Sequence, residues 1–504
     1  MKVLSFLLLL FFQTAVLAQD NPTGIFRYQT AIGNPQRAGS THYDAATQTY
    51  TLQGGGYNIW FNRDEFRYAY NVVKGDFILT ANFQFTGAGT NGHRKIGWMV
   101  RESTDAQASH MSAVVHGDGL TVLQWRPLRG AFMRDPQDEL FFSKRGPQII
   151  QLERSGKKFI MRVANPGEPL QTVGEKELPE LPDSALAGIF ICSHDSNVVE
   201  EMRAWNVRIV KPVRDNYNAY RGGFIGSRLE VMDVWSGQRK IIHESPGRFE
   251  APNFMPGGKK LLFNAEGSLY TIPVEGGTPE KFVVGDLTEL NNDHGISFDG
   301  KMLAVSHHRR GLPGGGSTVY VMPLAGGTPT LLTPKTPSYW HGWAPNNKEV
   351  LYVAQRDSGV YNIYKMNING GAEIPLTNNR TGHVDGPEYA PDGKYIYYNA
   401  NVTGTMQIWR MKPDGSGKEQ ITFDGYHNWF PHISPDGKWM VFISFPPEID
   451  PADHPFYKRV LLRLMPLTSP GSPRVIAYGY GGQGTINVPS WSPDGRYLAF
   501  VSNF

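Results

Sequence analysis

The fold of the second half of the chain is decided by the stretch Trp429-Phe430-Pro431-His432-Ile433-Ser434-Pro435-Asp436-Gly437-Lys438-Trp439-Met440-Val441-Phe442-Ile443-Ser444. At its centre, Ser434-Pro435-Asp436-Gly437 is a turn sequence, in which proline presets φ, aspartate caps the turn backbone and glycine accepts a positive φ. On either side of the turn the side chains alternate as in strands, so the stretch predicts a β-hairpin. Because one hairpin cannot bury both of its faces, copies of it must stack, which is typical of a repeat architecture.

The same turn recurs through the rest of the chain. Its last residue is Gly258, Gly300, Asn347, Gly393, Gly437 and Gly495, so successive turns are 42, 47, 46, 44 and 58 residues apart. This period is typical of propeller blades with four strands each. The longest interval contains an insertion, Phe445 to Tyr457, which we expect to form a loop over one face.

The ends of this repeat region indicate how the ring closes. Only Arg496 to Phe504 follow the last turn, so the second strand pair of that blade is missing from its expected place. A stretch with the right spacing, Arg228 to Ile242, precedes the first turn instead. We therefore predict a six-bladed β-propeller over residues 228–504, closed by strands from both ends of the domain. Five blades with an additional strand pair are the alternative.

Residues 19–212 show short alternating segments separated by glycine and polar turns, without a helical period. Strands are expected at Tyr50–Leu52, Phe77–Phe85, Lys95–Arg101, Met111–His116, Thr121–Trp125, Ile149–Glu153, Phe159–Val163, Ala187–Cys192 and Met202–Val210. So many strands in this length predict two antiparallel sheets packed face to face as a β-sandwich. Residues 213–227, polar and aromatic, are expected to link the sandwich to the propeller, and the whole chain is predicted to be all-β.

The first residues predict export. Met1-Lys2 and an apolar run that ends at Ala18 form a secretory signal peptide, residues 1–18, with cleavage before Gln19. The run is too short to span a bilayer comfortably, although a retained anchor is the alternative. No later segment is long and apolar enough to cross a membrane, so we expect a periplasmic or extracellular protein without a transmembrane segment once the signal is removed.

Charge and cysteine content exclude several classes of function. The formal net charge is +3 and no basic block is present, so nucleic acid is not expected as a partner. The only cysteine is Cys192, in an apolar run. An exported chain with no internal disulfide must be stabilised by large cores, and Cys192 is expected to be a buried small side chain.

The turn motifs resemble those of a known family. Ser-Pro-Asp-Gly followed by Lys or Arg occurs at Ser434–Lys438 and Ser492–Arg496, with a looser copy at Ala390–Lys394, and Gly-Gly-Thr-Pro begins at Gly276 and Gly326. Together they resemble the TolB-type β-propeller family, whose repeats are WD40-like and known as PD40. The resemblance spans residues 228–504 and implies a binding scaffold of the cell envelope or periplasm. The role of TolB itself is not implied, because a different N-terminal domain precedes this propeller.

The N-terminal half carries a second resemblance. Residues 95–103, 150–159 and 188–209 resemble the concanavalin A-like jelly-roll domains that accompany secreted carbohydrate-active proteins. The resemblance implies a jelly-roll fold for the sandwich. Such domains bind sugars, bind proteins or space other domains, so the resemblance does not decide between these functions.

Candidate site residues gather at one rim of the predicted channel, because the innermost strand of each blade lines it. Four successive blades bring a histidine there, and we consider His294, His341, His383 and His432 as metal ligands. Around them, Asp293, Trp340, Asp385, His427 and Trp429 are candidate ligand-binding residues. Imidazoles with a carboxylate suit a divalent metal (Mn, Zn or Ca) or an acid–base pair at a sugar. The alternative is hydrogen bonding to neighbouring strands or water, with the tryptophans packed between blades.

The sequence leaves three classes of function open. The first is an exported binding protein that holds a glycan or an envelope protein partner through the rim and the sandwich. The second is a metal-assisted polysaccharide lyase or hydrolase, supported by the convergence of histidines and by the carbohydrate-associated N-terminal domain. Asp293, His294, His341 and the turn motifs also resemble the oligogalacturonate lyases, which have seven blades and a His-bound metal. The third is a purely structural envelope role. We favour the first, because both predicted folds commonly bind ligands, and whether the protein is an enzyme stays open.

Overall fold

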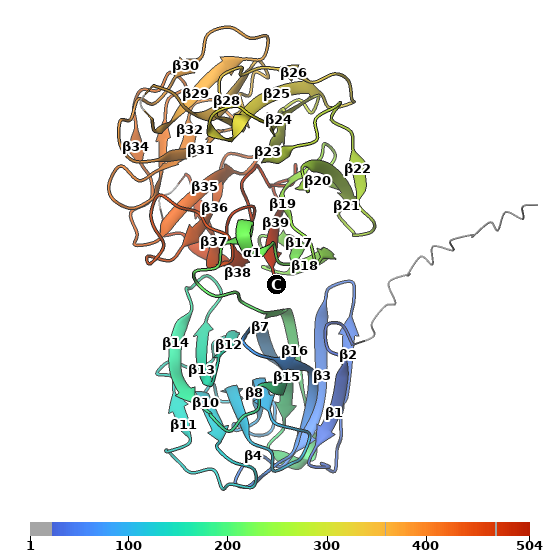
Figure 1. The fold of residues 1–504 in the computed structure, drawn as a ribbon. Helices are drawn as coiled ribbons and strands as arrows, with labels where there is room; N and C mark the ends of the chain where they lie inside the picture. Colours follow the sequence, from blue (N-terminus) through green and yellow to red (C-terminus); the bar gives the residue numbers. More distant parts are fainter. Residues whose placement is uncertain (1–22, 358, 469–470) are drawn as a thin grey trace, which may run out of the picture.

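The computed structural model describes residues 23–504 except 358, 469 and 470. The predicted signal peptide, residues 1–18, lies outside the described residues. The fold is all-β, as the sequence predicts; apart from strands, the described residues form a one-turn helix, α1 (Ala219–Gly222), and a 3-10 turn, η1 (Gly314–Gly316). No helix in this part of the chain has the length and apolar character needed to cross a membrane. Figure 1 shows two β structures, one above the other, with the C-terminus between them.

The lower part of Figure 1, which we call the two-sheet unit (residues 28–210), contains two seven-stranded antiparallel sheets. The first sheet has the order β1-β6-β15-β8-β9-β10-β11, with strands Tyr28–Ile32, Phe66–Lys74, Ser184–Cys192, Lys95–Arg101, His110–His116, Thr121–Arg126 and Glu139–Phe141. The second sheet has the order β14-β13-β12-β7-β16-β3-β2, with strands Gln171–Glu177, Lys158–Ala164, Ile149–Ser155, Phe77–Thr86, Asp195–Val210, Thr49–Gly56 and Ser40–Asp44. A short hairpin is formed by β4 (Ile59–Trp60) and β5 (Arg63–Asp64).

The two sheets share one hydrophobic core. Trp98 of β8 is buried in it together with Leu79 and Ile150 of the other sheet. The indole N–H of Trp98 donates to the carbonyl oxygen of Ile150 at 3.1 Å. The indole of Trp98 is therefore buried without an unpaired polar atom. Cys192 is free and fully buried in β15, as the sequence predicts.

The upper part of Figure 1 is a six-bladed β-propeller. Five blades are four-stranded antiparallel sheets in chain order: β19–β22 (Phe249–Phe254, Lys260–Ala265, Ser268–Pro273, Glu280–Phe282), β23–β26 (Leu290–Ile296, Met302–His308, Ser317–Pro323, Thr330–Leu331), β27–β30 (Ser338–Trp343, Glu349–Gln355, Tyr361–Asn367, Ile374–Pro375), β31–β34 (Val384–Tyr389, Ile396–Ala400, Gln407–Met411, Glu419–Gln420) and β35–β38 (His427–Ile433, Trp439–Phe445, Lys458–Pro466, Arg474–Gly481). In each of them the recurring turn joins the first two strands.

The sixth sheet contains β18 (Arg239–Ser245), β17 (Ser227–Asp233) and β39 (Tyr497–Asn503). β17 pairs with β39 in antiparallel register, from Ser227 opposite Asn503 to Asp233 opposite Tyr497. The first and last strands of the propeller region are therefore hydrogen-bonded neighbours.

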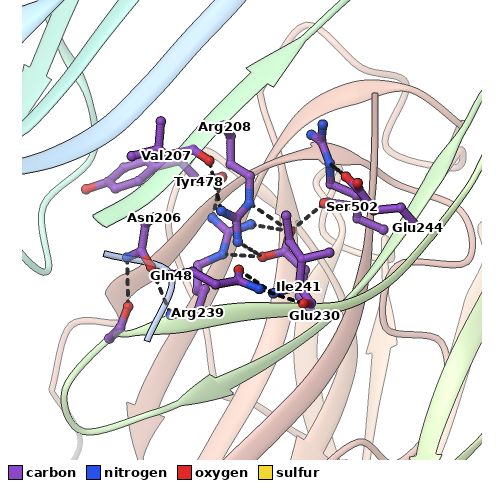
Figure 2. Close-up of polar contacts among 12 residues, drawn as sticks. Gln48, Asn206, Val207, Arg208, Glu230, Arg239, Ile241, Glu244, Tyr478 and Ser502 are labelled. Atoms are coloured by element: carbon purple, nitrogen blue, oxygen red, sulfur yellow. Dashed lines mark hydrogen bonds and ion pairs between the residues drawn. The ribbon is translucent and has the colours of Figure 1, made fainter. Parts of the chain in front are cut away.

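Polar contacts join the two-sheet unit to this sixth sheet, as Figure 2 shows. The side-chain amide of Gln48 donates to the carbonyl of Ile241 at 2.8 Å and accepts from its N–H at 2.9 Å. Asn206 donates to the carbonyl of Gly237 at 2.9 Å and accepts from the backbone N–H of Arg239 at 2.8 Å. These side chains satisfy backbone groups of the other part, which fixes how the two parts sit together.

The packing of β39 is tested by a matched pair of phenylalanine substitutions. Phe500 is 1% exposed in β39, whereas Phe423 is 76% exposed. We expect Phe500→Ala to lower the free energy of unfolding by about 3–5 kcal/mol, because it leaves a cavity in the core. Phe423→Ala should change it by less than about 0.5 kcal/mol. Urea denaturation measures both, and an equally small effect of the two changes would contradict a tightly packed final strand.

Candidate functional site

One end of the propeller channel is shaped by irregularities in the innermost strands. In β19, β23, β27, β31 and β35, pairing with the next strand is interrupted by extra residues. A bulge of this kind leaves a residue unpaired and re-aims its side chain. His341 is such a residue, because Trp340 and Gly342 on either side of it pair with the adjacent residues Tyr352 and Leu351.

The residues near these irregularities line a cavity of about 400 Å³, which we call the channel-mouth cavity. Its lining combines ionisable groups, amides and aromatic rings, and includes Arg248, Asn291, Asn292, Asp293, Tyr339, His341, Tyr361, His383, Asp385, Phe430, His454, Gln483 and Asn487. Converging polar groups within partly aromatic walls are typical of a site for a small ligand.

Asp385 is the centre of a hydrogen-bond network in this cavity. One carboxylate oxygen lies 2.9 Å from Nε2 of His341, and the other lies 3.4 Å from Nε2 of His383. The backbone N–H of Gly386 donates to the carboxylate at 2.8 Å. Burial opposes ionisation of Asp385, but the charge of His341 and the hydrogen bonds from both histidines hold its pKa well below the usual range.

His341 is the ion-pair partner of Asp385. Burial alone would lower the pKa of His341, but attraction and hydrogen bonding to Asp385 outweigh burial and raise it. The side chain of His341 is 5% exposed, and its ring stacks on that of Phe430 with 6.1 Å between centroids. The cavity therefore contains a buried histidine–aspartate ion pair.

Asp293 adds a second carboxyl group with a different charge state. Burial raises the pKa of Asp293 to about 7; His341 opposes this shift, whereas the charges of Asp385 and Glu250 add to it. Asp293 consequently exchanges its proton near neutral pH, so it can either donate or accept a hydrogen bond there.

A histidine from the predicted loop also reaches the cavity. His454 lies in the connection between β36 and β37, and its ring stacks on Trp429 with 4.5 Å between centroids and 13° between planes. Burial lowers the pKa of His454 to about 4, so its ring is neutral at physiological pH. The insertion of residues 445–457 thus contributes a side chain to the channel mouth.

The structure brings together only part of the predicted site. Asp293, His341, His383 and Asp385 line the channel-mouth cavity, whereas the other candidates do not: His294, Trp340, His427, Trp429 and His432.

His294 and His341 differ in position although their sequence contexts align. The extra residue of β27 is His341 itself, directly before Gly342. In β23 the interruption lies earlier, between Leu290 and His294, so that His294 pairs with Val305. His294 is therefore a regular ladder residue, 1% exposed, and burial lowers its pKa to about 4.

His432 and His427 are engaged inside the blades. In His432, Nδ1 lies 2.6 Å from the carboxylate of Glu388, and Nε2 lies 2.7 Å from the carbonyl oxygen of Ile486. In His427, Nε2 lies 3.4 Å from the carbonyl oxygen of Pro447.

The two candidate tryptophans are packing residues. Trp340 and Trp429 are both fully buried. Trp340 lies so close to Gly295 that a Cβ there would meet its ring at 2.0 Å, so glycine is required at this contact. Trp429 is covered by His454. Neither indole has an exposed face on which a sugar ring could stack. This agrees with the alternative in which the tryptophans pack between blades.

The arrangement of possible metal ligands follows from these positions. Within residues 23–504, leaving aside the three undescribed positions, no group of three or more His, Cys, Asp or Glu side chains is arranged to hold a metal ion. Of the predicted ligands, His341 and His383 face Asp385, and His294 and His432 lie in the blades.

Several cavity residues were not anticipated. Tyr339 stands two residues before His341, so strand alternation could have placed both on one side. Tyr361 lies with its ring centroid 5.5 Å from that of His383, and Arg248 forms an ion pair with Glu250. No local pattern marks Tyr361, Arg248 or His454, because only the tertiary fold brings them to the channel mouth.

Fold and cavity together define a six-bladed β-propeller with a polar cavity at one end of its channel. The PD40 family, described as the TolB beta propeller domain, matches residues 342–448. An uncharacterized protein of Agrobacterium fabrum is 44% identical over 284 residues, which cover 56% of this chain and 94% of the relative. The chain belongs to the TolB-like β-propeller family.

Two further similarities are of different extent. The solved structure of a putative TolB from Agrobacterium tumefaciens has a TM-score of 0.52 and 44% identity, and the match covers 56% of this chain and 99% of that chain. The Tol-Pal system protein TolB of Anaeromyxobacter dehalogenans is 30% identical over 82 residues, 16% of this chain and 18% of the relative.

The raised pKa of Asp293 predicts a stabilising substitution. Because its folded pKa of about 7 exceeds the ordinary value of 3.8, the contribution of Asp293 to stability is largest below pH 3.8 and is lost as the pH rises through 7. A tenfold change in the proton affinity of a group corresponds to about 1.4 kcal/mol. We expect Asp293→Asn to raise the free energy of unfolding by about 2–4 kcal/mol at pH 8 and to have little effect near pH 4. Chemical denaturation at both pH values measures this, and a loss of stability at pH 8 would contradict it.

Asp385 is predicted to control the charge of His341. We expect Asp385→Asn to lower the pKa of His341, because the attraction that offsets burial is removed. An NMR titration of the His341 ring, assigned by comparison with His341→Gln, measures the shift. As a control, Asp392→Asn changes an exposed carboxylate of the same blade and should leave the His341 titration unchanged. An unchanged titration in Asp385→Asn would show that the ion pair does not form in solution.

Proposed function

We propose that the protein is an exported, envelope-associated binding protein that holds a carbohydrate in the channel-mouth cavity. The observation that carries this proposal is the composition of the cavity, in which a charged histidine–aspartate pair, carboxamides and tyrosines surround about 400 Å³. A sugar presents hydroxyl groups that donate and accept, together with apolar ring faces, and such a lining offers partners for both.

Unpartnered polar atoms in the lining support a polar ligand. The buried side-chain nitrogens Nδ2 of Asn292 and Nδ1 of His341 have no hydrogen-bond partner within the described part of the protein. Buried polar groups are normally paired with protein or water, so these two atoms are available to water or to ligand hydroxyls. Asp293 adds a group that is able to donate or accept near neutral pH.

Export and envelope association are inferred from the predicted signal peptide, residues 1–18, and from the family. One relative is named Tol-Pal system protein TolB, and the resemblance to the TolB-type family implies a role in the envelope or periplasm. If no glycan binds, an envelope protein that binds at the same cavity is the alternative.

We also propose roles for the remaining parts of the chain. The two facing sheets of the N-terminal half support a concanavalin A-like jelly roll over residues 19–212, followed by a linker, residues 213–227. The pairing of β17 with β39 supports closure of the propeller, residues 228–504, by strands from both of its ends. In this arrangement the two-sheet unit presents or orients the propeller and its binding site.

The metal-assisted lyase or hydrolase is not favoured. Its site would need the histidines of four blades together, and among the described residues His294 and His432 lie away from His341 and His383. A divalent metal (Mn, Zn or Ca) stays a prediction that elemental analysis of the purified chain would test.

Binding is tested on the mature chain, residues 19–504, first on a glycan array and then by calorimetry with the strongest hit. We expect Asn292→Ala to weaken binding by about tenfold or more, because a buried amide loses its contact with the ligand. Asn369→Ala, an exposed asparagine of the same propeller, is the matched control and should bind as the unchanged chain does. Absence of any glycan ligand, or equal binding by both variants, would contradict a carbohydrate site in this cavity.

A further inference from the structure

A second set of cavities lies between the two-sheet unit and the propeller. One, of about 260 Å³, is lined from both parts by residues that include Gln151, Arg162, Arg208, Arg228, Arg239 and Arg459. An adjoining cavity of about 190 Å³ shares Thr80, Arg239 and Tyr478 with it. We call the larger one the interdomain cavity. It is separate from the channel-mouth cavity, with which it shares no lining residue.

Arg208, Arg228 and Arg239 line part of the interdomain cavity, and two of them share the fully buried carboxylate of Glu230. Glu230 accepts from Arg208 at 2.6 Å and from Arg239 at 2.8 Å, as Figure 2 shows. Arg228 is paired at 2.5 Å with Glu244, whose side chain is 46% exposed. Burial lowers the pKa of Arg239, Glu230 opposes this effect, and the nearby charges of Arg208 and Arg228 lower it further, so the three guanidinium groups repel one another.

A second group of lining residues repeats this imbalance. Glu153 of the two-sheet unit is bound by Arg162 at 2.6 Å and also forms an ion pair with Arg459 of the propeller. Arg162 is 22% exposed and Arg459 is 44% exposed, and both line the cavity. Two arginines again share one carboxylate.

The charges of the lining therefore do not cancel. Five lining guanidinium groups are ion-paired to three carboxylates that do not themselves line the cavity, Glu153, Glu230 and Glu244, and the lining carboxylate, Glu448, is exposed. Positive charge that is only partly compensated in a partly buried crevice attracts anions, because water screens it poorly there. Guanidinium groups also present paired N–H donors that match a carboxylate.

We propose that the interdomain cavity binds a small hydroxylated carboxylic acid of the sugar-acid class. The carboxylate of the ligand would lie among the arginines that bind Glu153 and Glu230. Each of these two glutamates is ion-paired with two arginines. Hydroxyl and amide groups of the lining, Thr80, Gln151, Tyr478, Ser502 and Asn503, provide partners for the hydroxyls of the acid. The volume of about 260 Å³ is near the lower end for small-molecule sites, which favours a single sugar unit.

Such a ligand would also stabilise the contact between the two-sheet unit and the propeller. Arg162 and Arg208 belong to the two-sheet unit, whereas Arg228, Arg239 and Arg459 belong to the propeller. An anion between them adds contacts from both sides, so its binding stabilises the docked arrangement over any state in which the parts separate.

The test uses the mature chain and D-glucuronate as the probe, with D-glucose and inorganic phosphate as comparison ligands. Calorimetry should detect glucuronate binding, a thermal melt should show a higher Tm in its presence, and glucose should bind at least about tenfold more weakly, because it lacks the charged group. Arg459→Gln and Arg162→Gln should each weaken glucuronate binding by about tenfold. Both variants are expected to fold, because Glu153 retains one arginine in each.

The matched control is Arg145→Gln, which removes an exposed arginine of the two-sheet unit that pairs with Asp118 outside the cavity. It should bind glucuronate as the unchanged chain does. The proposal is overturned if glucuronate does not bind, if Arg459→Gln and Arg162→Gln bind it undiminished, or if phosphate binds as tightly as glucuronate. Loss of glucuronate binding in Asn292→Ala would also overturn it, since the acid would then occupy the channel-mouth cavity.

Discussion

The buried carboxylate of Glu230 is the interaction on which the arrangement of the two parts depends. It stands in β17, is fully buried, and accepts from Arg208 of the two-sheet unit, Arg239 of β18 and Ser502 of β39. Burial alone would raise the pKa of Glu230, yet the two guanidinium groups hold it well below the usual range. A desolvated charge is tolerated only when its partners are complete. The first strand of the propeller, its last strand and the preceding unit must therefore be in place together.

The channel mouth differs from the Glu230 cluster, because burial there raises the pKa of a carboxyl group, Asp293, above its usual value. Interrupted pairing in the innermost strands places His341 and Asp293 beside the channel, where a regular ladder would continue the blade. The cost of burying Asp293 appears as its raised pKa. Titratable groups with perturbed pKa values in a cavity are characteristic of functional sites, where stability is given up for recognition.

The sequence predicted the repeating part of the fold well and the site only in part. The turn at Ser434–Gly437 and its copies determine local backbone geometry, so blade number and strand order follow from their spacing. The turn sequences do not determine where the bulges lie. His294 and His341 both precede a glycine, yet His294 is paired in its strand ladder and His341 is the extra residue of a bulge. Trp429 and Trp340 are residues of a type that stacks on sugar rings, so the sequence made them candidates for binding a ligand. Whether they are buried depends on the neighbouring blades, which the local sequence does not show. His454 reaches the channel through a loop whose path no periodicity describes.

The stacking of His454 on Trp429 has an optical consequence. The two rings lie 4.5 Å apart, and the indole is fully buried at the edge of the cavity. Indole emission responds to the polarity and to the protonation of a ring in contact with it. A ligand that moves His454, or a proton that charges it, would change the environment of one tryptophan within the structure. Trp429 is thus an intrinsic fluorophore placed to report a change at His454, without any added label.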